Sequence, residues 1–171
     1  MSELAVPARA TPAQAAFRIL VVDDDQDMAA FLARLLKYEA LSVETVFDGS
    51  SALASVAARP PDLILLDVML PDMNGFEICE RLKADPATAL TPIVLVTALE
   101  DQESRVRGIQ AGADDFLSKP VKREELIARV NTLRRLHETR KELESRRLAA
   151  EVQRKDRRPR RSDRASARTP D

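Results

Sequence analysis

Short runs of apolar residues alternate with amphipathic segments along most of this chain. Several of the apolar runs are continuous, which is typical of strands that are buried on both faces of a sheet. The segments between the runs repeat apolar residues at the spacing of a helix. This pattern predicts strands at 18–22, 43–46, 62–66, 92–96 and 114–117, and helices at 26–38, 50–58, 75–84 and 102–111.

The regular alternation of strands and helices predicts an α/β fold. Strands joined through helices form right-handed crossovers, and these give a parallel sheet with helices on both faces. Turn residues support the boundaries, because Pro60 and Pro61 follow one predicted helix and Gly112 follows another. We therefore expect a doubly wound, five-stranded parallel sheet.

A final helix is expected to begin near Arg123, and no helix-breaking residue follows before Pro159. Helices of this fold class usually run for roughly 10–14 residues, so the part beyond Leu136 is expected to extend past the globular domain. Apolar residues recur along this helix at nearly heptad spacing, which is typical of a coiled coil. They are Leu126, Leu133, Leu136, Leu143 and Ala150.

Arg140 and Arg147 occupy the remaining positions of that seam, so a single exposed and charged helix fits the pattern equally well. His137 is the only histidine of the chain, and we expect it on the surface of this helix. The expected organisation is a disordered leader at 1–16, a domain at 17–136, the extended helix at 137–156 and a basic disordered tail at 157–171.

Composition narrows the classes of protein further. The length of 171 residues suits one domain with tails. The sequence holds neither the roughly 20 apolar residues of a membrane span nor a signal peptide, so we expect a cytoplasmic protein with no membrane partner. Cys79 is the only cysteine and is expected in the core. Residues 151–171 carry 8 basic and 4 acidic side chains. This basic end could bind nucleic acid, although a solvated tail is the favoured interpretation.

Polar residues end four of the predicted strands. Asp23 and Asp24 follow the first strand and Asp67 follows the third, while Thr97 and Lys119 close the fourth and fifth. The carboxyl ends of parallel strands share one edge of the sheet, which is where ligands bind in such folds. A cluster of carboxylates needs a cation to balance its charge. A site of oxygen ligands with open positions for phosphate suits Mg²⁺. An Asp in such a site can act as a nucleophile toward phosphorus.

Four segments together closely resemble the receiver domain of two-component response regulators, over about residues 17–135. They are Leu20–Asp25, Asp67–Gly75, Val96–Ala98 and Ala113–Pro120. The resemblance is greatest to receivers that precede cyclic-di-GMP signalling domains. It implies a flavodoxin-like sheet of strand order 2-1-3-4-5 with an extended C-terminal helix.

The resemblance also implies a role for each site residue. Asp67 would accept a phosphoryl group from a histidine kinase or a histidine phosphotransfer protein. Asp24, Asp67 and the backbone carbonyl of Met69 would bind Mg²⁺ directly, and Asp23 would act on the metal mostly through water. Lys119, the Thr97 hydroxyl and the backbone of Ala98 would each contact the phosphoryl group. Thr97 would also act as a switch by moving toward the phosphoryl group, and Phe116 would turn inward behind it. The peptide bond between Lys119 and Pro120 would be cis.

Met69 and Leu99 flank the position from which water would attack an aspartyl phosphate in this family. Both are apolar, which predicts slow hydrolysis of the phosphorylated protein. Beyond this self-phosphorylation and autodephosphorylation chemistry, no enzyme activity is expected. A haloacid-dehalogenase-like phosphatase also uses a nucleophilic Asp, but its general acid normally stands where this chain has Met69.

Phosphorylation is then expected to change the face formed by the fourth helix, the fifth strand and the last helix. The favoured output is control of a downstream protein partner or of a homodimer. The alternatives are a receiver whose basic tail binds nucleic acid, and a fragment of a cyclic-di-GMP signalling protein. No catalytic output signature follows the receiver-like segments.

Overall fold

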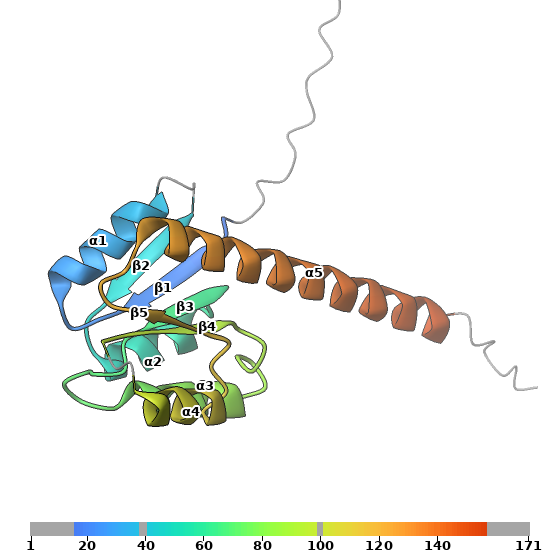
Figure 1. Ribbon diagram of the computed structural model, residues 1–171. Coiled ribbons are helices and arrows are strands. Elements are labelled where there is room, and N and C mark those ends of the chain that lie inside the picture. The colour runs from blue at the N-terminus through green and yellow to red at the C-terminus, as the bar shows by residue number, and fades with distance from the viewer. Residues whose placement is uncertain (1–15, 38–40, 99–100, 157–171) are drawn as a thin grey trace, which may run out of the picture. The chain divides into compact units, whose positions relative to one another are not determined.

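The structure is a computed structural model, and it describes residues 16–37, 41–98 and 101–156. A sheet of five parallel strands forms its centre, in the order β2-β1-β3-β4-β5 (Figure 1). The predicted fold class and strand order are therefore confirmed. The strands are β1 (Arg18–Val22), β2 (Ser42–Val46), β3 (Leu63–Leu66), β4 (Ile93–Thr97) and β5 (Asp115–Ser118).

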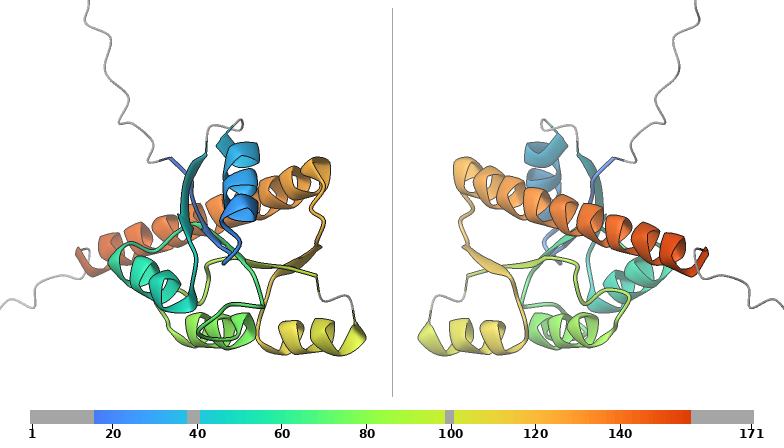
Figure 2. Two further views of the ribbon diagram at one scale, coloured as in Figure 1. Left: turned by 90° about the vertical axis from the view of Figure 1, so that its left-hand side faces the viewer. Right: turned by 90° about the vertical axis from the view of Figure 1, so that its right-hand side faces the viewer.

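Helices cover both faces of this sheet. Helices α1 and α5 lie on one face, and α2, α3 and α4 lie on the other (Figures 1 and 2). Their bounds are α1 (Gln26–Lys37), α2 (Gly49–Ala58), α3 (Gly75–Ala84), α4 (Gln102–Gln110) and α5 (Arg123–Asp156). Every predicted strand and helix is present, and no predicted boundary differs from the observed one by more than one residue.

The central strands are buried on both faces because their side chains alternate between two apolar clusters. In β1, Ile19 and Val21 join the cluster beneath α1 and α5, whereas Leu20 and Val22 join the cluster beneath α2 and α3. A strand whose two faces are both buried has no polar positions, which explains the continuous apolar runs of the sequence. Cys79 is completely buried in the second cluster, as predicted.

Gly112, which follows α4, adopts φ +89°. This left-handed conformation favours glycine and closes the helix, since the backbone N–H of Gly112 donates to the Ile109 carbonyl at 3.0 Å. The chain then turns into β5 and reaches Lys119, whose peptide bond to Pro120 is cis, as the resemblance implied.

Helix α5 spans two units of the chain. The unit that contains the sheet ends at His137, and the second unit starts at Glu138. Every described side chain of residues 138–156 is exposed. The predicted leader and tail lie outside the described residues, apart from Ala16.

The expectation for His137 was wrong. Its side chain is only 8 % exposed, its Nε2 lies 3.3 Å from Asp62 Oδ1, and its ring meets the Phe17 ring edge-on. Phe17 and Asp62 flank the amino ends of β1 and β3, so contacts distant in sequence bury this histidine.

The predicted seam of α5 also needs correction at its start. Leu126 is completely buried in the core beneath α1 and α5, and Leu133 packs against the same cluster. These two side chains therefore belong to the receiver-like domain, because the sheet face covers that side of the helix. Leu136 and Leu143 are 52 % and 60 % exposed.

Within the described ranges, no helix combines the length and the apolar composition that a membrane-spanning segment requires.

Candidate functional site

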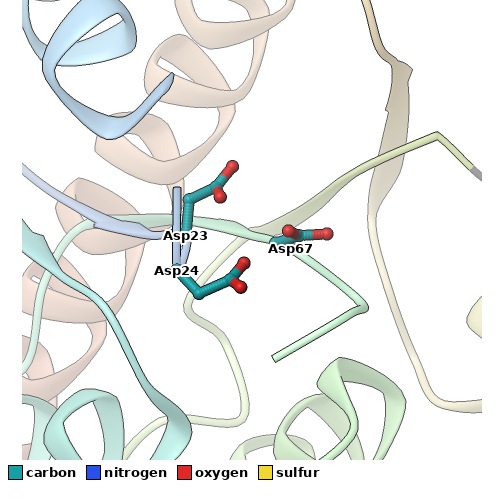
Figure 3. A group of neighbouring side chains, drawn as sticks. All are labelled: Asp23, Asp24 and Asp67. Carbon is teal, nitrogen blue, oxygen red and sulfur yellow. The ribbon is translucent and has the colours of Figure 1, made fainter. Parts of the chain in front are cut away.

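Three carboxylates lie together at the carboxyl edge of the sheet (Figure 3). Asp23 and Asp24 follow the last residue of β1, and Asp67 follows the last residue of β3. One oxygen from each carboxylate can be chosen so that all three lie within 4.8 Å of one another. Asp23 and Asp67 are 1 % and 5 % exposed, whereas Asp24 is open to solvent.

Parallel pairing explains why these side chains meet. Val22 of β1 is in register with Leu66 of β3, so the residues that follow them leave the sheet side by side. The backbone N–H of Asp67 donates to the Val22 carbonyl at 2.9 Å, which extends the ladder by one bond and fixes the base of the Asp67 side chain. The carboxylates are therefore positioned by the core of the sheet and not by a loop.

Lys119 joins the two buried carboxylates. Its ammonium group donates to Asp23 Oδ2 at 2.8 Å and to Asp67 Oδ2 at 3.1 Å. The backbone N–H of Lys119 donates to the Thr97 carbonyl at 3.0 Å, which ties the end of β5 to the end of β4. The ammonium thus balances part of the negative charge of the cluster.

The cluster also receives backbone hydrogen bonds. The N–H of Met69 donates to Asp67 Oδ1 at 3.2 Å, and the N–H of Asp25 donates to Asp23 Oδ1 at 2.9 Å. Asp25 itself accepts from the N–H groups of Asp27 and Met28 at the start of α1, so it caps this helix. Asp25 thus immediately precedes α1, and Asp27 lies in the first turn of this helix.

This geometry can be compared with that of known proteins. Residues 19–131 match the family model of the response regulator receiver domain. The chain belongs to this family. Response regulator PleD from Caulobacter vibrioides is 48 % identical over 118 residues, which are 69 % of this chain and 26 % of that protein. DNA-binding response regulator MtrA from Mycolicibacterium smegmatis is 46 % identical over 121 residues, 71 % of this chain and 52 % of MtrA.

Solved receivers have the same fold. A putative response regulator from Chloroflexus aurantiacus aligns with a TM-score of 0.67 at 34 % identity, over 70 % of this chain and 98 % of its own. The beryllofluoride-activated receiver domain of DrrB aligns with a TM-score of 0.64 at 36 % identity, over 70 % and 97 %. The present chain thus covers nearly the whole length of both solved receivers, but it spans about a quarter to a half of the length of the curated relatives named above.

Burial and the neighbouring charges change the pKa values of Asp67 and Lys119. Desolvation raises the pKa of Asp67, although the charge of Lys119 and the hydrogen bonds from Lys119 and Met69 oppose the rise. Burial alone would lower the pKa of Lys119, but its hydrogen bonds to Asp23 and Asp67 and their charges together raise it. Lys119 is therefore held as a cation, and the buried carboxylate of Asp67 gains from any further positive charge nearby.

The carboxylates fit a divalent cation. Carboxylate oxygens are the ligands that Mg²⁺ prefers, and Mg²⁺ usually binds through one or two of them while it keeps several waters. Two of the three side chains are buried and the third faces solvent, so the set offers hard ligands together with open positions. The receiver therefore has an Asp cluster that could hold a metal ion.

The other candidate residues surround this cluster. Thr97 is the last residue of β4 and is 4 % exposed, and Ala98 follows it at the surface. Phe116 lies in β5, half-buried against the second apolar cluster. Met69 is 62 % exposed, and Leu99 lies outside the described residues.

Sequence reasoning missed two contacts of the site. It assigned Lys119 only to a phosphoryl oxygen, whereas here the ammonium joins Asp23 and Asp67. It also missed Asp72, which accepts hydrogen bonds from the N–H groups of Gly49 and Ser50, each at 2.8 Å, and so fastens the loop after Asp67 to the start of α2. An acidic residue before a glycine-led helix is too common to have predicted this contact.

Proposed function

We propose that Asp67 accepts a phosphoryl group from a phosphohistidine on a histidine kinase or a histidine phosphotransfer protein. The observation that carries this proposal is the buried Asp67 carboxylate, which lies within hydrogen-bond distance of Lys119 and beside two further carboxylates. One carboxylate oxygen of Asp67 attacks phosphorus. The P–N bond to the imidazole breaks, its electron pair returns to the ring nitrogen, and the product is an acyl phosphate.

Asp24, Asp67 and the Met69 carbonyl would hold Mg²⁺, and Asp23 would act on it through water. Bound Mg²⁺ would neutralise part of the charge on the phosphoryl oxygens. Lys119 then exchanges its contact with Asp67 for a phosphoryl oxygen and remains paired with Asp23. The Thr97 hydroxyl and the Ala98 N–H donate to the other oxygens, and these donors stabilise the charge that develops during transfer.

We further infer that the output passes through the face formed by α4, β5 and α5. Phosphorylation adds negative charge next to Thr97 and Lys119, at the ends of β4 and β5, and can shift a two-state equilibrium there. Exposed apolar side chains support this face as a contact surface, since Val106 and Ile109 of α4 are 44 % and 65 % exposed. The partner is a downstream protein or a second copy of the chain.

The test is intact mass spectrometry after incubation with Mg²⁺ and either acetyl phosphate or phosphoramidate, whose P–N bond resembles that of phosphohistidine. The wild type should gain one phosphoryl group, and Asp67→Asn should gain none. Asp27→Asn is the matched control, because Asp27 is an exposed acid at the start of α1. An adduct on Asp67→Asn, or none on the wild type, would show that Asp67 is not the acceptor.

Light scattering after size-exclusion chromatography then separates the two outputs. A change to dimer on addition of Mg²⁺ and beryllofluoride would establish self-association. An unchanged monomer that carries the phosphoryl group would assign the output to a different protein. The nucleic-acid alternative depends largely on residues 157–171, which lie outside the described part of the chain.

A further inference from the structure

Helix α4 contains a glycine in its interior, where glycine is among the least favourable residues. Of the nine residues of α4, all of which the structure describes, only Gly108 is buried. The backbone of Gly108 is helical, so no positive φ requires glycine at this position. The absence of a side chain therefore needs a reason in packing.

Phe116 provides that reason. A Cβ atom at Gly108 would lie under 3.0 Å from two ring atoms of Phe116, Cζ and Cε1, and from Leu95 Cδ1. Leu95 is completely buried in the sheet, so its side chain cannot withdraw. The Phe116 ring is half-buried and is the member of this contact that can move.

The contact lies between the proposed phosphoryl site and α4. Phe116 pairs with Leu95 in the sheet, and two residues further along each strand Ser118 pairs with Thr97. Lys119 follows immediately. The ring of Phe116 thus stands on the strand that leads to Lys119 and beside the strand that ends in Thr97, while its tip touches the backbone of α4.

In the part of the chain that the structure describes, few other side-chain contacts hold α4 in place. The guanidinium of Arg107 lies over the Phe76 ring at 5.0 Å, and the exposed Val106 and Ile109 contribute little burial. A helix with so few buried contacts belongs to the less stable part of a domain and can be displaced at low cost. Its position is therefore sensitive to the ring that occupies the space beside Gly108.

We propose that Gly108 is a positioning residue, whose missing side chain provides the space in which the Phe116 ring rests against α4. The position of the ring and the position of α4 are thereby set together. This inference rests on the proposed switch role of Phe116 and adds the residue that transmits the switch to α4. An alanine at position 108 must either displace the ring or lift the helix.

The test is a double-mutant cycle of Gly108→Ala and Phe116→Leu, because leucine lacks the two ring atoms that would clash. Two quantities are measured for each variant, namely the affinity for beryllofluoride in Mg²⁺ and the hydrogen exchange of the α4 amides without the analogue. In the Phe116 background, Gly108→Ala should weaken beryllofluoride binding roughly tenfold, within the usual range of allosteric coupling, and should accelerate exchange in α4.

In the Phe116→Leu background only the contact with Leu95 Cδ1 remains, so Gly108→Ala should reduce the affinity and accelerate exchange in α4 much less than it does beside Phe116. Gln110→Ala controls for helix propensity, since Gln110 is an exposed residue of the same helix. A loss of affinity or a faster exchange of equal size in both backgrounds would overturn the inference.

The two proposals can fail separately. If the wild type binds no beryllofluoride, the proposed phosphoacceptor function fails, while the exchange measurements still decide the role of Gly108. If Gly108→Ala does not fold, a folded double variant supports the steric contact, and an unfolded double variant refutes it.

Discussion

Asp24 offers a direct test of the metal site, because it is the exposed member of the carboxylate cluster. Replacing it with asparagine removes one charge and nearly preserves the shape of the side chain. Asp23 and Asp67 are buried, so their replacement would also disturb the contacts to Lys119. We therefore expect Asp24→Asn to separate metal binding from folding.

The size of the effect follows from two terms. Carboxylates that lie within 4.8 Å of each other repel by about 0.9 kcal/mol or more even in water. Asp24→Asn removes two such repulsions and one attraction to Lys119, so the metal-free variant should gain about 1 kcal/mol in its free energy of unfolding. In the wild type, Mg²⁺ at ten times its dissociation constant adds about 1.4 kcal/mol, which corresponds to roughly 5 °C in Tm for a domain of this size.

The assay is thermal unfolding of the wild type and Asp24→Asn, with a Mg²⁺ titration and with Asp27→Asn as the control for a lost surface charge. The wild type and the control should rise in Tm with Mg²⁺, and Asp24→Asn should start higher and stay constant. An undiminished Mg²⁺ shift in Asp24→Asn would refute the assignment of the metal site. A lower Tm of this variant without Mg²⁺ would refute the argument from repulsion.

Two further measurements concern residues near the site and in the core. The hydrogen bonds from Gly49 and Ser50 hold the pKa of Asp72 at about 2, so the stability it contributes is present above its unfolded pKa of about 4 and is lost as pH falls toward 2. The difference in the free energy of unfolding by urea between the wild type and Asp72→Asn should thus be constant above pH 5 and should shrink between about pH 4 and 2. A difference that does not change with pH would contradict this. Burial raises the pKa of the Cys79 thiol to about 11, so a disulfide reagent at about pH 8 should modify it far more slowly in the native protein than in urea; equal rates would show that Cys79 is accessible.

The strands and the carboxylate cluster could be predicted from the local sequence pattern, because apolar runs mark the strands and polar residues mark where the strands end. A continuous apolar run such as Leu63–Leu66 identifies a strand buried on both faces, and the polar residue that follows it must leave the sheet at the shared edge. Asp23 after β1 and Asp67 after β3 satisfy this rule, whereas Lys119 follows the partly buried strand β5. Their meeting in space is a consequence of parallel pairing and needs no knowledge of side-chain geometry.

The environment of His137 could not be predicted in this way. Its partner Asp62 is 75 residues away in the sequence, and nothing in the helical pattern of α5 indicates that the amino ends of β1 and β3 lie beneath it. The same limit applies to Leu126 and Leu133, whose spacing suits a coiled-coil seam as well as a core. Periodicity shows which face of a helix is apolar, and the partner that covers this face depends on tertiary structure.

The rigidity of this receiver is distributed unevenly, and the distribution suits its proposed role. Asp23, Asp24 and Asp67 follow the ends of β1 and β3, whose side chains are all buried, so the carboxylates of the proposed phosphoryl site are held in a fixed geometry. Helix α4, in contrast, buries one glycine and exposes two of its apolar side chains. A charge added at this site would therefore displace β1 or β3 very little. The element that can move at low cost is α4, which contacts Phe116. Since α4 also exposes Val106 and Ile109, its displacement would change the surface that a partner protein contacts. The proposed chemistry at Asp67 would thus be linked to recognition at α4 through the Phe116 ring.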